Sequence, residues 1–181
     1  VPNTVLPAPN RTAPSDVIVL GHIGIGGRGS GFLRPGWSAA LCDVDQTRLQ
    51  RAADRVSGGN EEAKKNLRLY TDYRDLLDQK DLDAVFIASP DHWHALHTIH
   101  ACEAGKDVYV EKPACKTIEE GRAMVTAATR YARVVQVGSQ GRSQNGAYHG
   151  KKYIANGQIG DVNRIECWHY PTPAGDWWEN S

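Results

Sequence analysis

The chain has 181 residues with 21 basic and 21 acidic side chains, so its formal net charge is zero. Balanced charge without long runs of one sign argues against a nucleic-acid partner, and no apolar run approaches the roughly 18 residues that a membrane helix needs. The balanced charge therefore favours a small-molecule function. A chain of this length supports one good hydrophobic core and the start of a second.

The first residues form a proline-rich polar lead over residues 1–15. Proline lacks a backbone N–H and fixes φ, so no regular structure is expected before Val17. The lead is consistent with removal of an export signal or with trimming of the chain.

An apolar strand pattern then runs directly into a glycine-rich segment. Glycines at Gly24, Gly26 and Gly29 have the spacing G-x-G-x-x-G. The first permits a sharp turn, the second allows close approach of a diphosphate, and the third allows the next helix to pack near the strand. The phosphates are expected at the helix N-terminus. Pro35 cuts that helix short.

A second strand is predicted over residues 37–43, ending in Asp43, which lies 19 residues after Gly24. This spacing is typical of the acid that binds the adenosine ribose diol, so Asp43 favours NAD over NADP. Arg48 is a nearby base that could weaken this discrimination. The alternative is that Asp43 only caps the following helix, although Asp45 is the better cap.

Strand and helix patterns alternate through the remainder of the main domain, which is predicted to span residues 16–141. This order is typical of an α/β, doubly wound parallel sheet of the Rossmann type, with ligands at the carboxyl ends of the strands. Asp72, Asp91 and a Thr117–Glu120 capping box mark helix starts, and Gly105 marks a helix end. The predicted strands cover 67–70, 83–88, 107–111 and 133–137, the helices 46–56, 73–79, 94–104 and 118–131, and the segment 57–66 is a loop.

Residues 142–181 are predicted to begin an incomplete α+β domain, with a helix over 143–157 and a strand over 161–170. About forty residues are too few for an independent substrate domain. Trp168, Trp177 and Trp178 concentrate aromatic surface there, which another chain or a continuation of this one should cover.

The remaining cysteines and histidines give no metal motif. The four cysteines lack a C-x-x-C pair and are expected to be buried thiols. His94, His97 and His100 share one helix at three-residue steps, so metal binding is an alternative, but each step rotates the face and no carboxylate joins them. His97, His100 and His22 are expected to pack in the ordinary way. The cysteines are Cys42, Cys102, Cys115 and Cys167.

Several blocks together resemble the Gfo/Idh/MocA oxidoreductase family. The most specific is Glu111-Lys112-Pro113, because its order behind a strand is not explained by nucleotide binding in general. The others are the glycine loop at 21–31, Leu41-Cys42-Asp43-Val44-Asp45, Ser89-Pro90-Asp91-His92-Trp93-His94 and Val135-Gln136-Val137-Gly138-Ser139-Gln140.

The resemblance implies that Lys112 is catalytic, standing beside the nicotinamide and touching the substrate hydroxyl, with Pro113 shaping the turn, often in the cis form. A positive nicotinamide nearby would favour the neutral amine of Lys112 as proton acceptor. The expected cofactor-binding residues are Gly24, Gly26, Gly27, Arg28, Gly29, Asp43, Ser89, Pro90, His92, Trp93, His94, Glu111 and Pro113.

The implied activity is hydride transfer between NAD(P), with NAD preferred, and a secondary alcohol of a sugar, polyol or related carbohydrate. The alternatives are a redox-neutral NAD-dependent glycoside hydrolase or lyase and a noncatalytic nucleotide-binding module. The family's second domain normally adds a catalytic aspartate and histidine, whereas His169 is expected to pack. The resemblance also implies a homo-oligomer and twin-arginine export to a bacterial periplasm, with a cytoplasmic location as the alternative.

Overall fold

The computed structural model describes residues 18–167. The predicted lead over residues 1–15 lies outside that range, as do Trp168, His169, Trp177 and Trp178. Contacts divide the chain into two units, one ending at Gly138 and the other beginning at Ser139.

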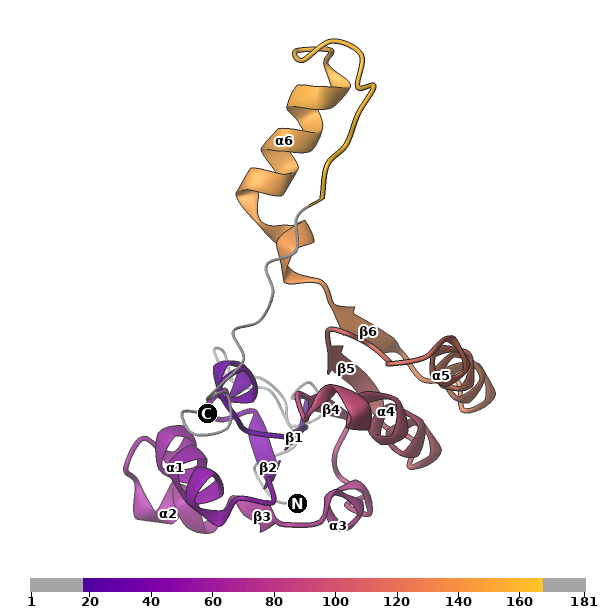
Figure 1. The fold of residues 1–181 in the computed structure, drawn as a ribbon. Coiled ribbons are helices and arrows are strands. Elements are labelled where there is room, and N and C mark those ends of the chain that lie inside the picture. The colour runs from indigo at the N-terminus through magenta and orange to yellow at the C-terminus, as the bar shows by residue number, and fades with distance from the viewer. Residues whose placement is uncertain (1–17, 168–181) are drawn as a thin grey trace, which may run out of the picture. The chain divides into compact units, whose positions relative to one another are not determined.

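The first unit is built on one parallel sheet of six strands (Figure 1). The order β3-β2-β1-β4-β5-β6 reverses direction at β1, which is the hallmark of a doubly wound sheet. The predicted fold class is therefore confirmed. The strands are β1 Leu20–Ile23, β2 Ser38–Cys42, β3 Arg68–Tyr70, β4 Ala84–Ile87, β5 Asp107–Glu111 and β6 Val135–Gly138.

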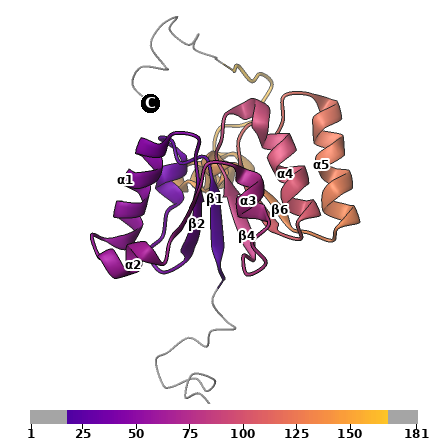
Figure 2. The same ribbon diagram turned by 90° about the horizontal axis from the view of Figure 1, so that it is seen from below.

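Helices cover this sheet from two sides (Figure 2). α1 packs on one side through Leu49, Ala53 and Val56, which meet Leu41 of β2 in one apolar cluster. A larger cluster lies between the sheet and α3, α4 and α5. Right-handed crossovers produce this division, because winding outward from β1 in opposite directions places the connecting helices on opposite faces. The helices are α1 Gln46–Ser57, α2 Glu61–Lys65, α3 Tyr73–Leu77, α4 His94–Glu103 and α5 Ile118–Arg130.

Side-chain caps begin three helices where the sequence predicts them. Asp45 accepts hydrogen bonds from the Thr47 and Arg48 amides at the start of α1. Asp72 accepts from the Arg74 amide at α3. The predicted capping box of α5 is present in both directions. Such caps satisfy amides that have no partner within the helix.

Two helix starts differ from the prediction. Residues 61–65 form α2 where a loop is expected, because Asn60 caps the Glu62 and Ala63 amides. Asp91 opens a 3-10 turn, Asp91–Trp93, and does not cap α4, which begins at His94 without a side-chain cap.

The cysteine prediction is partly wrong. Cys42 and Cys102 are buried, but Cys115 is half-buried and Cys167 is exposed. Burial, reinforced by the Asp43 charge, raises the pKa of Cys42 to about 12, so this thiol stays protonated and unreactive.

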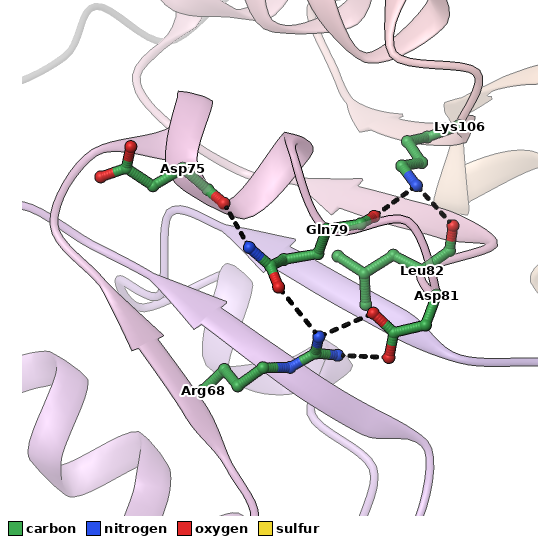
Figure 3. Close-up of polar contacts among 6 residues, drawn as sticks. All are labelled: Arg68, Asp75, Gln79, Asp81, Leu82 and Lys106. Atoms are coloured by element: carbon green, nitrogen blue, oxygen red, sulfur yellow. Dashed lines mark hydrogen bonds and ion pairs between the residues drawn. The ribbon is translucent and has the colours of Figure 1, made fainter.

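A cluster of polar contacts lies at the amino ends of the strands and contains Arg68, Gln79, Asp81 and Lys106 (Figure 3). Lys106, just before β5, is buried and donates to the Gln79 and Leu82 carbonyl oxygens at 2.6 and 2.9 Å. Arg68 pairs with both oxygens of Asp81 at 2.7 and 2.9 Å and with the Gln79 side chain. The buried ammonium of Lys106 is thus satisfied by two carbonyl oxygens, whereas the neighbouring Arg68–Asp81 pair lies nearer the surface.

The second unit, as far as residue 167, contains the 3-10 helix η4 Gln140–Ser143 and α6 Asn145–Ala155. The predicted helix is therefore present with shorter bounds. The strand predicted over 161–170 is wrong for its described part, since residues 161–167 have no strand structure. An alternating pattern forms a strand only when a neighbouring strand pairs with it, and none does so within residues 139–167.

Candidate functional site

The carboxyl ends of four strands meet at one edge of the sheet. Ile23 is paired with Cys42 and with Ile87, and Ile87 with Val110. The residues that follow these strands therefore emerge side by side: Gly24, Asp43, Ala88 and, at the end of β5, Glu111. The sequence prediction that the glycine loop, Asp43 and the two later motifs converge is confirmed at the backbone level.

The turn after β1 depends on glycine at two positions. Gly24 has φ +83°, and a Cβ there would lie 2.5 Å from the Ser89 backbone nitrogen. A Cβ on Gly29 would collide with the Gly24 carbonyl oxygen. Both glycines are thus required for the strand to turn and for the loop after β4 to pack against it.

The middle of the loop is open. Nothing lies within 4 Å of a Cβ placed on Gly27, and one on Gly26 would meet only the end of Arg48, 3.2 Å from Nη1. This open backbone fits the approach of a diphosphate. The helix that follows is a four-residue 3-10 helix, η2 Gly29–Phe32, so the phosphates would depend on loop amides more than on the predicted helix N-terminus.

Asp43 joins the glycine loop to the end of β2. Its Oδ2 accepts from the Ile25 amide at 2.7 Å and its Oδ1 from the Asp45 amide at 2.9 Å. Asp45 caps α1, so the alternative in which Asp43 is merely the helix cap is wrong. Arg48 forms an ion pair with Asp45, with 3.3 Å between Nε and Oδ2. That pairing leaves Asp43 as the anionic group at the end of β2.

The Glu111-Lys112-Pro113 turn follows β5. The Lys112-Pro113 peptide bond is cis, as the family resemblance implies. Lys112 is exposed, whereas Glu111 is buried and accepts from the Lys112 amide at 3.3 Å. Arg28 donates from Nε to Glu111 at 3.0 Å and lies over the Phe32 ring. Arg28, predicted as a cofactor-binding residue, therefore contacts the motif that contains Lys112.

The loop after β4 presents exposed side chains at Pro90, His92 and Trp93. The Trp93 ring stacks on His97, with centroids 5.3 Å apart and planes 19° from parallel. His97 Nδ1 lies 3.0 Å from the Ser89 hydroxyl oxygen. Burial, with a smaller contribution from neighbouring histidines, lowers the pKa of His97 to about 4, so its ring is neutral at pH 7. Sequence reasoning treated His97 as an ordinary helix residue and missed this support for Trp93.

His94 is turned into the protein, with 1% of its surface exposed. Its Nδ1 lies 2.6 Å from the Pro113 carbonyl oxygen and its Nε2 lies 2.8 Å from that of Ser89. His100 instead contacts the Tyr73 hydroxyl at 2.8 Å. His94 and His97 thus contact the carbonyl and the hydroxyl of the same Ser89, whereas His100 contacts Tyr73. No cluster of metal-binding side chains occurs among residues 18–167. Within the same range, no helix is long and apolar enough to cross a membrane.

Comparison with known proteins identifies the family. Residues 20–139 match the Gfo/Idh/MocA model, described as an oxidoreductase family with an NAD-binding Rossmann fold. A glycosyl hydrolase family 109 protein of Shewanella baltica is 36% identical over 125 residues, covering 64% of this chain and 27% of that protein. Inositol 2-dehydrogenase of Salmonella typhimurium is 32% identical over 158 residues, covering 83% of this chain and 45% of that enzyme.

A solved structure gives the same result. The scyllo-inositol dehydrogenase of Lactobacillus casei, solved with NAD(H) and scyllo-inositol, has a TM-score of 0.67 and 26% identity. The match covers 80% of this chain and 43% of that enzyme. The chain thus spans less than half the length of these relatives. It belongs to the Gfo/Idh/MocA oxidoreductase family, and its residues 20–139 are the family's NAD-binding Rossmann domain.

Proposed function

We propose that the chain carries the cofactor-binding half of an NAD-dependent dehydrogenase that oxidises a secondary alcohol of a sugar, polyol or related carbohydrate. The observation that carries the proposal is the convergence of the glycine loop, Asp43 and the exposed Lys112 at one edge of the sheet. Relatives named inositol dehydrogenases support a polyhydroxylated substrate.

In this proposal each group has one task. NAD, when bound, supplies the hydride acceptor. The open glycine loop holds the diphosphate, and the Asp43 carboxylate holds the ribose diol and disfavours a 2′-phosphate. The Lys112 amine accepts the hydroxyl proton, since a neutral amine in reach of an alcohol acts as a general base.

Cofactor binding is tested by calorimetric titration of the chain with NAD and NADP. We expect NAD to bind more tightly, because the Asp43 carboxylate would repel the extra phosphate. Preference for NADP would overturn the assignment of Asp43, and failure to bind either nucleotide would remove the basis of the proposal.

The role of Lys112 is tested by Lys112→Ala in the full-length protein. Loss of a general base lowers kcat by about 100-fold or more, while the Kd of NAD changes by less than about threefold. Lys116→Ala is the matched control, because Lys116 is another exposed lysine on the same connection. Equal kcat values for Lys112→Ala and Lys116→Ala would contradict the role.

A second candidate function is favoured by the relatives named glycosyl hydrolase family 109 proteins. Here NAD would accept a hydride from a ring carbon, and the acidified neighbouring carbon would lose a proton as the glycosidic bond breaks and the alcohol leaves. Water would then add where the alcohol left and the hydride would be returned, so the cofactor is not consumed. Absorbance at the NADH band separates the two candidates. Steady accumulation of NADH with a carbohydrate supports the dehydrogenase, whereas turnover without net NADH supports the glycosidase.

A further inference from the structure

We propose that His94 sets the position of the Lys112 turn by donating hydrogen bonds from both of its ring nitrogens to two backbone carbonyls. The part that concerns Lys112 as the reacting amine rests on the proposed function. The hydrogen bonds proposed for the His94 ring do not depend on that function. His94 is a positioning residue in this proposal, since its buried ring is fully engaged within the protein.

The argument begins with the partners of the ring. Carbonyl oxygens only accept hydrogen bonds, and the two that face His94, from Ser89 and Pro113, lie 2.8 and 2.6 Å from Nε2 and Nδ1. A neutral imidazole carries hydrogen on one nitrogen, so it satisfies one of these contacts and points a lone pair at the other oxygen. Both contacts are favourable only when both nitrogens carry hydrogen.

His97, one turn further along α4, provides the internal comparison. Its Nδ1 faces the Ser89 hydroxyl, which can donate as well as accept. A neutral ring therefore satisfies the geometry, in agreement with the strongly lowered pKa of His97. Two buried histidines on one helix are thus expected in different protonation states because their partners differ.

The location of the contacts gives His94 its effect. Pro113 is bonded directly to Lys112, and its carbonyl is held by α4 through His94. On the other side of Lys112, Glu111 accepts from the Lys112 amide and from Arg28 of the glycine loop. The Lys112 side chain is exposed, so its origin is fixed through the backbone on both flanks. The other charged or titratable groups on the segments next to His94 are Asp91, His92, the half-buried Cys115 and Lys116.

The first experiment reads the ring nitrogens of the unmodified, ¹⁵N-labelled chain by two-bond ¹H–¹⁵N correlation at pH 7, without cofactor. We expect both nitrogens of His94 to show protonated shifts and one nitrogen of His97 to show the unprotonated shift. A neutral His94 tautomer would overturn the proposal. This outcome is independent of whether the chain binds NAD, so it separates the proposal from the proposed function.

The second experiment compares His94→Asn with His94→Gln. The Asn amide nitrogen lies near the position of Nδ1 and can keep the Pro113 contact, whereas that of Gln lies near Nε2 and can keep only the Ser89 contact. We expect His94→Gln to shift the backbone amide signals of Lys112 and Ala114 and His94→Asn to shift them much less. The Leu49 amide of α1, which packs in the other apolar cluster, is the reference signal.

The kinetic consequence is measured in the full-length protein. Misplacing the amine by a fraction of an ångström lowers kcat for His94→Gln on the order of tenfold or more, with the KM for NAD changed by less than about threefold. His94→Asn recovers most of the kcat. Equal effects of Asn and Gln on the turn and on kcat would overturn the positioning role. If His94→Gln does not fold, the ring measurement on the unmodified chain still decides the bonding state, and His94→Asn still tests the turn.

Discussion

At the scale of one residue, Gly24 shows how the edge of the sheet that carries the candidate site depends on the absence of a Cβ atom. Its positive φ and its closeness to the Ser89 backbone are separate requirements, and both exclude a Cβ. The second requirement ties the glycine loop to the loop after β4, so the residue joins two of the segments that converge on the site.

We therefore expect Gly24→Ala to lower the free energy of unfolding by more than about 2 kcal/mol, because the left-handed conformation and the backbone contact are both unfavourable. NAD affinity falls with it. Urea denaturation and calorimetry measure the two effects.

Gly27→Ala is the matched control within the same loop, since open space surrounds that position. Its free energy of unfolding should change by less than about 1 kcal/mol. Equal destabilisation by the two substitutions would contradict this interpretation of the loop.

The residue types at the site could be predicted from sequence, but some of their orientations could not. Glycine spacing and the Asp43 position report a backbone shape that few other patterns produce. The inward direction of His94 was not predictable, because its two partners, the carbonyls of Ser89 and Pro113, lie on segments outside α4. The Arg28–Glu111 contact likewise joins residues 83 positions apart, and no local pattern reports such a pair.

At the scale of an element, α5 illustrates a helix whose start is written in its sequence. Thr117 accepts from the Glu120 amide at 3.2 Å, and the Glu120 side chain accepts from the Thr117 amide at 3.2 Å. Two backbone donors that the helix cannot satisfy are thus paired at the end of the segment that begins with the Lys112 turn.

Thr117→Ala should lower the free energy of unfolding by about 1 kcal/mol, through loss of this cap. Thr126→Ala is the control on the same helix, since that exposed hydroxyl only bonds back to the Arg122 carbonyl and alanine is the better helix former. Its urea midpoint should be unchanged or slightly higher. A lower midpoint for Thr126→Ala than for Thr117→Ala would show that the capping box does not stabilise α5.

Elements whose sequence lacks a capping box or a regular apolar pattern were harder to predict. α2 has five residues and no buried side chain, so it lacks the apolar periodicity by which helices are recognised and depends on its Asn60 cap. The segment 161–167 shows the opposite case, because its alternation suggested a strand but pairing is a tertiary property. An alternation of apolar and polar residues indicates which face of a strand could be buried. It does not indicate which other strand would pair with it.

At the scale of the whole molecule, two buried histidines couple folding to pH. Burial, with a smaller contribution from Arg34, lowers the pKa of His22 to about 4, and burial similarly lowers that of His97 to about 4. Both rings bind protons more readily in the unfolded chain, whose histidines titrate near pH 6.5. Their contribution to stability is complete above that pH and is lost as the pH falls toward 4.

Between pH 7 and pH 5, each of these two histidines should therefore lower the free energy of unfolding by about 2 kcal/mol. Urea denaturation at the two pH values measures the difference. His22→Gln keeps an amide near the position of Nε2, where the ring meets the Ser38 hydroxyl at 2.8 Å, and removes one titration. Relative to the unmodified chain, that variant should lose about 2 kcal/mol of the change between the two pH values, whereas an unchanged pH dependence would show that His22 does not contribute.

The doubly wound parallel architecture was predictable because its rules are global and simple. Near-continuous apolar strands separated by helices require a parallel sheet, and right-handed crossovers then limit the arrangements. The polar cluster at the amino ends of the strands was not predicted, since Lys106 and Arg68 look like ordinary surface residues in the sequence. Only the folded chain places them against Gln79 and Asp81.

The double contact of Asp43 has a calorimetric consequence. Because the Asp43 carboxylate joins the Ile25 and Asp45 amides, the protein's own contacts restrain the backbone of the glycine loop, and few backbone torsions should remain to be ordered when NAD binds. Association should therefore give a small negative heat-capacity change that matches the surface of the nucleotide alone, without the larger value that accompanies coupled folding.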